Sequence, residues 1–200
     1  MFIIDDLLEI AATAKLVINS LETAGKAIMA VAKALGLADG EETLEDLGDK
    51  AIQAAGAGII PASFEEYSDY VHAVEQFEVD PEKSKEISQE DKIGKSIELL
   101  SRYAGEKCGI EPDTMVGLMN NIARSPQISS FFDECSDMLA NAIKENPMFA
   151  GSLDRYLSGQ ERNEGRMDDV ENKLTEMGKE AHPEMSDFEI VKIVDQLRQK

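Results

Sequence analysis

The sequence predicts an all-α protein, a multi-helix bundle of about eight helices built on a long N-terminal helix and an antiparallel helical hairpin. Apolar residues recur at alternating steps of three and four over the first 35 positions, which is the spacing of one helix face. Side chains and prolines that favour helix starts recur along the rest of the chain. A strand points successive side chains to opposite faces, so it could not bury the same set.

The first predicted helix spans Ile3 to Leu35 and contains no proline. It would be roughly 50 Å long, at about 1.5 Å per residue. Such a helix is either a buried core helix or half of a coiled coil that binds a partner. On one flank of the helix, Ala11, Ile18, Gly25 and Ala32 would let another helix approach closely. The apolar seam consists of Ile3, Leu7, Ile10, Ala14, Val17, Leu21, Ala24, Ile28, Val31 and Leu35.

Two further helices are predicted in the N-terminal part. Thr43 with Asp46 resembles a capping box, and the helix that follows would form an antiparallel hairpin with the first one. Ser63 with Glu66 is a second capping box, which predicts a helix over the apolar positions from Phe64 to about Phe77.

The next stretch, residues 78–92, carries almost no apolar side chain and is a candidate linker or loop. We therefore divide the chain into an N-terminal hairpin plus third helix (1–79), a polar linker or loop (80–92) and a C-terminal helical subdomain (93–200). The first and last parts could also share one continuous core.

The C-terminal half is predicted to be a series of helices with short connections. Ser88 with Asp91 opens one helix, and Ser186 with Glu189 opens the last. Proline is favoured at the first helical position, where its missing N–H costs nothing. The three helices expected to start in this way begin at Pro112, Pro126 and Pro147. A further helix carries Met167, Val170, Leu174 and Met177.

Composition limits the classes of function. The chain has 40 acidic and 20 basic residues, and its net charge of -20 would repel nucleic acid and anionic membranes. Charged residues interrupt the apolar N-terminal stretch, so we expect no membrane span, and Asp5 and Asp6 disfavour a signal peptide. Cys108 and Cys135 lie at apolar positions, as buried thiols do. These features favour the cytoplasm, although translocation without a leader stays open.

The sequence contains little that indicates catalysis. Asp69 and His72 stand three residues apart and could share a metal ion, but Lys179 occupies the place that a matching acid would take before His182. They are weak metal candidates only. No nucleophile motif, phosphate-binding glycine loop or zinc motif occurs. We therefore predict no catalytic residue and no cofactor.

The expected function is that of a non-catalytic acidic module that binds another protein as an adaptor, accessory protein or inhibitor. The partner would have a basic surface, and the N-terminal helix could also join two copies of the chain. An acidic DNA mimic that inhibits a nucleic-acid-binding enzyme is one alternative, and a metal-dependent helical enzyme centred on His72 is another. The candidate partner-binding residues are Leu7, Ala14, Leu21, Gly25, Ile28, Val191 and Val194.

Overall fold

The structure is a computed structural model, and it describes residues 21–38 and 40–198. In this part of the chain the elements are helical, as the apolar spacing predicts. The bounds of the helices are α2 (Leu21–Leu35), α3 (Leu44–Gly56), the 3-10 helix η1 (Pro61–Ser63), α4 (Tyr67–Glu75), α5 (Pro81–Ser84), α6 (Gln89–Cys108), α7 (Pro112–Ala123), α8 (Pro126–Glu134), α9 (Ser136–Glu145), α10 (Met148–Leu157), α11 (Glu164–Ala181) and α12 (Asp187–Leu197).

The described residues thus hold eleven α-helices, more than the eight or so that the sequence predicts. One addition is α5, a single turn inside the predicted linker. Another arises because the helix expected to run from Pro126 is broken at Cys135, whose φ of -103° and ψ of 12° lie outside the α-helical region. Nothing in the local sequence explains this break, since it contains neither glycine nor proline.

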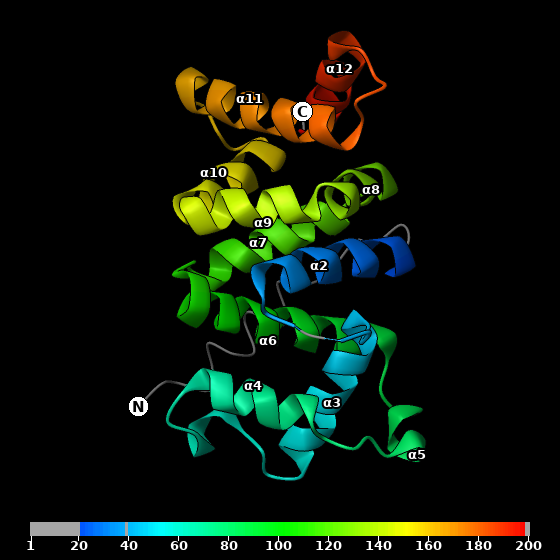
Figure 1. The fold of residues 1–200 in the computed structure, drawn as a ribbon. Coiled ribbons are helices and arrows are strands. Elements are labelled where there is room, and N and C mark those ends of the chain that lie inside the picture. Colours follow the sequence, from blue (N-terminus) through cyan, green and yellow to red (C-terminus); the bar gives the residue numbers. More distant parts are fainter. Residues whose placement is uncertain (1–20, 39, 199–200) are drawn as a thin grey trace.

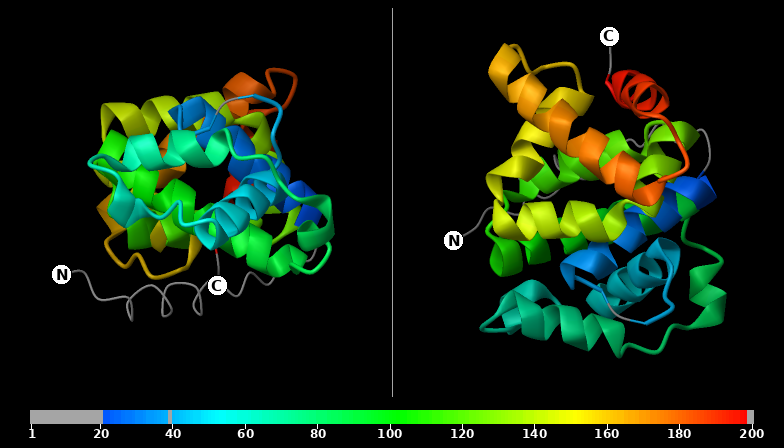
Figure 2. Two further views of the ribbon diagram at one scale, coloured as in Figure 1. Left: turned by 90° about the horizontal axis from the view of Figure 1, so that it is seen from below. Right: turned by 45° about the horizontal axis from the view of Figure 1, so that its top comes forward.

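The helices are stacked in layers, with α2 in the middle of the stack (Figure 1). On one side α2 packs on α7, α8 and α9, and on the other it contacts α3 and α6. The pair α11 and α12 lies at one end of the stack, and α3, α4 and α5 lie at the other (Figures 1 and 2).

The apolar seam of the N-terminal helix is buried wherever the structure describes its side chains. Ala24, Ile28, Val31 and Leu35 have exposed fractions of 2% or less. Two lysines from other helices close the end of α2: Lys144 of α9 donates to the Ala34 carbonyl at 2.6 Å, and Lys107 of α6 donates to the Gly36 carbonyl. Cations stabilise this end of a helix, where carbonyl groups lack partners. The first part of the predicted rod, residues 1–20, lies outside the described residues.

Most of the predicted helix starts are confirmed. Thr43 and Asp46 form a reciprocal capping box at α3, as Ser186 and Glu189 do at α12. Ser88 caps α6. Prolines occupy the start of α7 and α8, whereas α10 begins one residue after Pro147.

The predicted helix start at Ser63 and Glu66 is wrong. Ser63 belongs to η1, and α4 begins only at Tyr67. The first N–H groups of α4 instead donate to Glu106 of α6, over 2.8 Å from Tyr67 and 3.1 Å from Ser68. A carboxylate from a distant helix thus satisfies the donors that a local capping box would have satisfied.

The main partner of α3 is α6, and Gly48 allows the two backbones to approach closely. A Cβ atom at Gly48 would lie 1.7 Å from the Lys92 carbonyl oxygen. With α2, by contrast, α3 makes only a small contact, near Gly25 and Leu44. The buried residues on both sides of residues 80–92 belong to one hydrophobic cluster. The division into subdomains at that stretch stays a prediction.

Candidate interaction sites

Two exposed apolar side chains lie on the outward side of α12. Phe188 is 78% exposed and Val191, one turn further on, is 44% exposed. We call these two residues and the positions around them the α12 outer face. The opposite side of the helix carries Ile190, Val194 and Leu197, all buried. Figure 2 shows α12 at the end of the molecule, with one side against α11 and the other directed away from the fold.

The α12 outer face is held in place by contacts on the inner side of the helix. Ile190 lies over Gly178 of α11, where a Cβ atom would come within 2.8 Å of the Ile190 side chain. Arg124, the residue after α7, donates to the Leu157 and Leu197 carbonyls, each at 2.6 Å, and so joins the ends of α10 and α12. These contacts hold the inner side of α12 against the fold. Phe188 and Val191 lie on the other side of the same helix and stay exposed.

Carboxylates predominate around this face. Asp187 and Asp195 are exposed within about one helical turn of Phe188 or Val191, and so is one cation, Lys192. Glu184 is exposed in the turn before α12. Asp187 also pairs with Lys179 of α11 at 3.0 Å. The face therefore combines an apolar centre with a largely acidic border.

The second candidate is a groove of about 620 Å³ along α2, which we call the α2–α3 groove. Its apolar floor includes Met29, Leu44 and Ile93. The residues that line it come from α2, the loop before α3, the start of α3, α6 and α8. They are Gly25, Lys26, Met29, Ala30, Lys33, Glu41, Glu42, Thr43, Leu44, Glu45, Gln89, Ile93 and Asp133.

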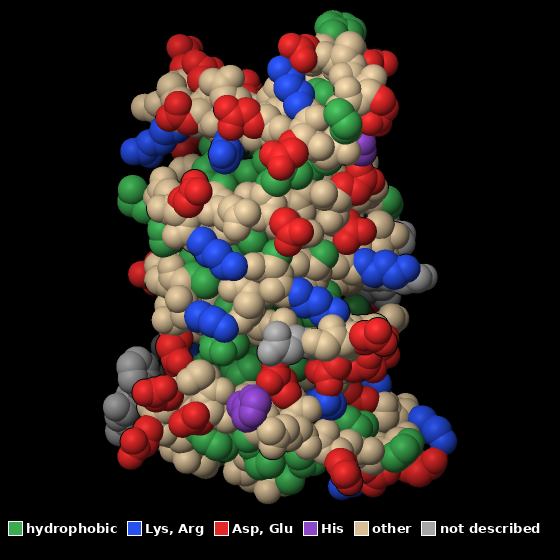
Figure 3. Space-filling model, in the orientation of Figure 1, with side chains coloured by type: hydrophobic (Ala, Val, Ile, Leu, Met, Phe, Trp, Pro, Cys, Tyr) green, Lys and Arg blue, Asp and Glu red, His purple; other side chains and the backbone are tan. Residues whose placement is uncertain are grey.

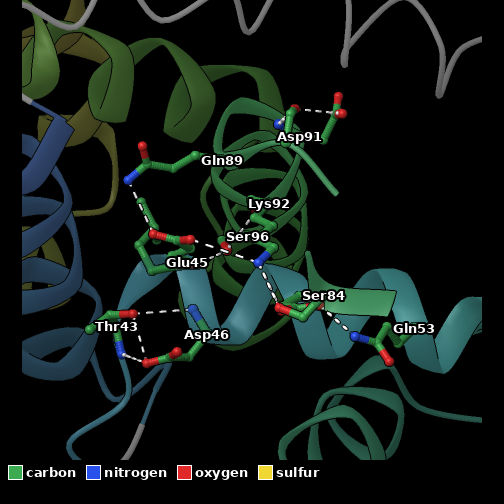
Figure 4. Close-up of polar contacts among 12 residues, drawn as sticks. Thr43, Glu45, Asp46, Gln53, Ser84, Gln89, Asp91, Lys92 and Ser96 are labelled. Carbon is green, nitrogen blue, oxygen red and sulfur yellow. Dashed lines mark hydrogen bonds and ion pairs between the residues drawn. The ribbon is translucent and has the colours of Figure 1, made fainter. Parts of the chain in front are cut away.

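A largely buried polar cluster adjoins Glu45, one of the acidic residues that line this groove (Figure 4). Glu45 accepts a hydrogen bond from Gln89 at 3.1 Å and lies 3.8 Å from Lys92. Lys92 is only 8% exposed and pairs with Asp49, also 8% exposed, at 3.0 Å. Burial raises the pKa of Asp49, but hydrogen bonds from Ser84, Gln53 and Lys92 and the charge of Lys92 outweigh it, so the pKa lies below its ordinary value.

The weak metal candidates do not form a ligand set. His72 has 71% of its side chain exposed, and its acidic neighbour is Glu75 of the same helix, 3.4 Å away. Asp69 is exposed on α4. Among the described residues, no three His, Cys, Asp or Glu side chains are grouped so that they could hold a metal ion. The geometry therefore gives the alternative of a metal-dependent enzyme centred on His72 no support.

The predicted partner-binding residues lie in different parts of the structure. Val191 lies on the α12 outer face, and Gly25 lines the α2–α3 groove. Ile28 and Val194 belong to the core instead, with exposed fractions of 0% and 2%, because the helices packed on α2 and α12 cover them. Leu7, Ala14 and the side chain of Leu21 lie outside the described part of the structure.

The sequence analysis did not single out Phe188 of the last helix as a candidate. Two apolar stripes overlap there, one through Phe188 and Val191 and one through Ile190, Val194 and Leu197. Both have helical spacing, so periodicity alone could not tell which one faces the core. Lys92 carries no sequence signal of its burial, since it lies in a run of charged residues.

Both cysteines are free. Cys135 is buried, and burial raises the pKa of its thiol to about 12. Burial also raises the pKa of the half-buried Cys108, although Lys144 and Lys107 lower it in part. A thiol with a raised pKa forms little thiolate at neutral pH and is a weak nucleophile.

The chain has no match among protein-family models, curated proteins or solved structures. Among residues 21–38 and 40–198, no helix combines the length and the apolar character that crossing a membrane requires.

Proposed function

We propose that this protein is a non-catalytic, acidic interaction module that binds a partner protein through the α12 outer face. The observation that carries the proposal is the exposure of Phe188 and Val191, on adjacent turns of a helix whose other apolar side is already buried. Exposed apolar side chains that adjoin one another mark interaction surfaces, whereas single ones are common on any protein surface.

The acidic border indicates the chemistry of the partner. Glu184, Asp187 and Asp195 would attract a basic surface with an apolar centre, and the net charge of -20 would speed its approach. In this proposal the module acts as an adaptor, accessory protein or inhibitor in the cytoplasm. The two free thiols agree with that compartment.

The test compares the full chain as bait with a double variant, Phe188→Asp with Val191→Asp. Captured proteins are quantified by mass spectrometry at low and high salt. We expect a basic partner that is retained by the wild type, lost with the double variant and weakened by salt, since salt screens exposed charges. Met148→Asp is the matched control, because Met148 is also 78% exposed but lies on α10.

A partner that binds the double variant as well as it binds the wild type would contradict the proposal. The DNA-mimic alternative predicts a different partner, a nucleic-acid-binding enzyme held by continuous rows of carboxylates. On the face in Figure 3, Lys and Arg side chains lie among the carboxylates at the level of α9, α2 and α6. This mixture of charges favours the α12 outer face over an acidic array.

A further inference from the structure

One face of α2 forms a wall of the α2–α3 groove. The lining residues Gly25, Lys26, Met29, Ala30 and Lys33 recur along one side of α2. Gly25 and Ala30 are half-buried and small, so a second helix could come close to the α2 backbone there. The groove thus combines small residues on one wall with an apolar floor, the two features on which a helix packs closely.

The sequence before α2 carries a matching stripe. Heptad steps back from Gly25 lead to Ile18, Ala11 and Ile4, and Leu8 lies on the same stripe. No glycine or proline occurs between Ile3 and Leu21, so the heptad pattern predicts that the helix continues straight. A helix that continued in this way would carry the stripe beyond the groove of its own chain.

We infer that the α2–α3 groove binds the first twenty residues of a second copy of the chain, in an antiparallel and symmetric dimer. A two-fold axis at Ile18 would place Ala11 of one copy opposite Gly25 of the other, which brings two small residues together. Leu7 and Leu8 would then lie at the level of Met29, over the apolar floor of the groove. Each copy supplies both the groove and the stripe, as a two-fold interface requires.

Charges agree with the antiparallel direction. Asp5 and Asp6 of one copy fall within about one helical turn of Lys33 of the other, and Glu9 falls beside Lys26. Lys15 would approach the wall that carries Glu41, Glu42 and Glu45. A parallel pairing would give none of these matches, because it would place each residue beside its own equivalent.

The test is the mass of the full chain by sedimentation equilibrium over a wide range of concentration and salt. We expect a species of twice the 22.0 kDa chain mass. The few exposed ion pairs of the interface contribute little, whereas two chains of net charge -20 repel each other, so association should tighten as salt screens that repulsion. This response is opposite to that of the basic partner on α12, so the two proposals can fail separately.

Variants locate the interface. Ala30→Glu should weaken association at least about tenfold, because it puts an unpaired carboxylate into the lining of the α2–α3 groove. Ala55→Glu is the matched control and should leave association unchanged, since Ala55 is also a half-buried helical alanine but does not line the groove. Lys33→Glu should weaken the dimer, and adding Asp5→Lys and Asp6→Lys should restore it.

Three results would overturn the inference. They are a chain that stays monomeric throughout the range, a dimer that Ala30→Glu and Lys33→Glu leave unchanged, and a monomer whose first twenty residues show hydrogen-exchange protection that Ala30→Glu abolishes. The third result would mean that the segment folds back into the groove of its own chain.

Discussion

At the scale of single residues, the buried pair of Lys92 and Asp49 fixes the contact between α3 and α6. Lys92 also donates to Ser84 at 2.9 Å, and Gln53 donates to Asp49 at 2.8 Å, so α5 and the end of α3 are tied to the same cluster. Every charge in the cluster has a partner, which is the condition under which burial of a charge is tolerated.

Removing the cation from this cluster should be costly. Lys92→Met keeps most of the stem but leaves Asp49 buried and without a positive partner, so we expect a loss of about 3–5 kcal/mol in the free energy of unfolding. Lys95→Met, which removes the pair with Glu98 on the more exposed side of α6, should cost about 0–1 kcal/mol. Urea denaturation measures both. Equal effects would contradict the role of burial.

The raised pKa of Asp154 predicts that this residue favours the folded state at low pH. Burial between α7 and α10 raises its pKa, although a 2.8 Å hydrogen bond from Asn121 and the charge of Arg155 lower it in part. The folded state therefore holds this proton more tightly than the unfolded state, whose Asp pKa is about 3.9. The contribution of Asp154 to stability is complete below that value and is lost as pH rises through the folded pKa.

We therefore expect Asp154→Asn to be more stable than the wild type near neutral pH. The variant keeps the oxygen that accepts from Asn121 and stays neutral. Its advantage should shrink as the pH is lowered toward about 4. Urea denaturation of both proteins across this range measures the difference between them, which removes the pH dependence of the other acids. An advantage that does not change with pH would contradict the assignment to Asp154.

Interactions between residues that are close in the sequence could be predicted from it, whereas interactions between distant residues could not. The caps at Thr43, Ser88 and Ser186 depend on neighbours three residues away, so spacing reveals them. Glu106 caps α4 from a distance of 38 residues, and Lys92 meets Asp49 across two helices. Neither partner leaves a local pattern in the sequence.

At the scale of elements, the approach of α3 to α6 depends on Gly48. Gly48→Ala would force the Cβ atom into the Lys92 carbonyl, so the helices must separate, and we expect a loss of at least about 3 kcal/mol. Gly94→Ala on α6 is the matched control, because a Cβ atom there meets nothing within 4 Å. The control should gain about 0.5–1 kcal/mol from helix propensity. Thermal unfolding distinguishes the two, and a destabilised Gly94→Ala would contradict the explanation.

The helices themselves were the most predictable elements, since each long one has a periodic apolar face and a start signal. Two features of the helices were not predicted from the sequence. The turn of α5 has a cap at Asp80 and a proline at Pro81 but no apolar face, and the break at Cys135 has no sequence signal. Of the two residues at the centre of the candidate site, the sequence analysis named Val191 but not its exposed neighbour Phe188.

For the whole molecule, the described helices form one stack with a shared core and a surface rich in carboxylates (Figures 1 and 3). The fold class followed from helical periodicity along the chain. The order of the layers did not, because the seam of α2 could equally have been covered by its own chain or by another. In the structure, α7, α8 and α9 cover it from Ala24 onward.

The central claim is that the α12 outer face is where a partner protein binds. Amide hydrogen exchange of the full chain, measured alone and with the captured basic partner, tests it most directly. We predict slower exchange over Asp187–Leu197 in the complex, with α4 and α5 at the far end unchanged. Slower exchange elsewhere, with α12 unaffected, would contradict the claim.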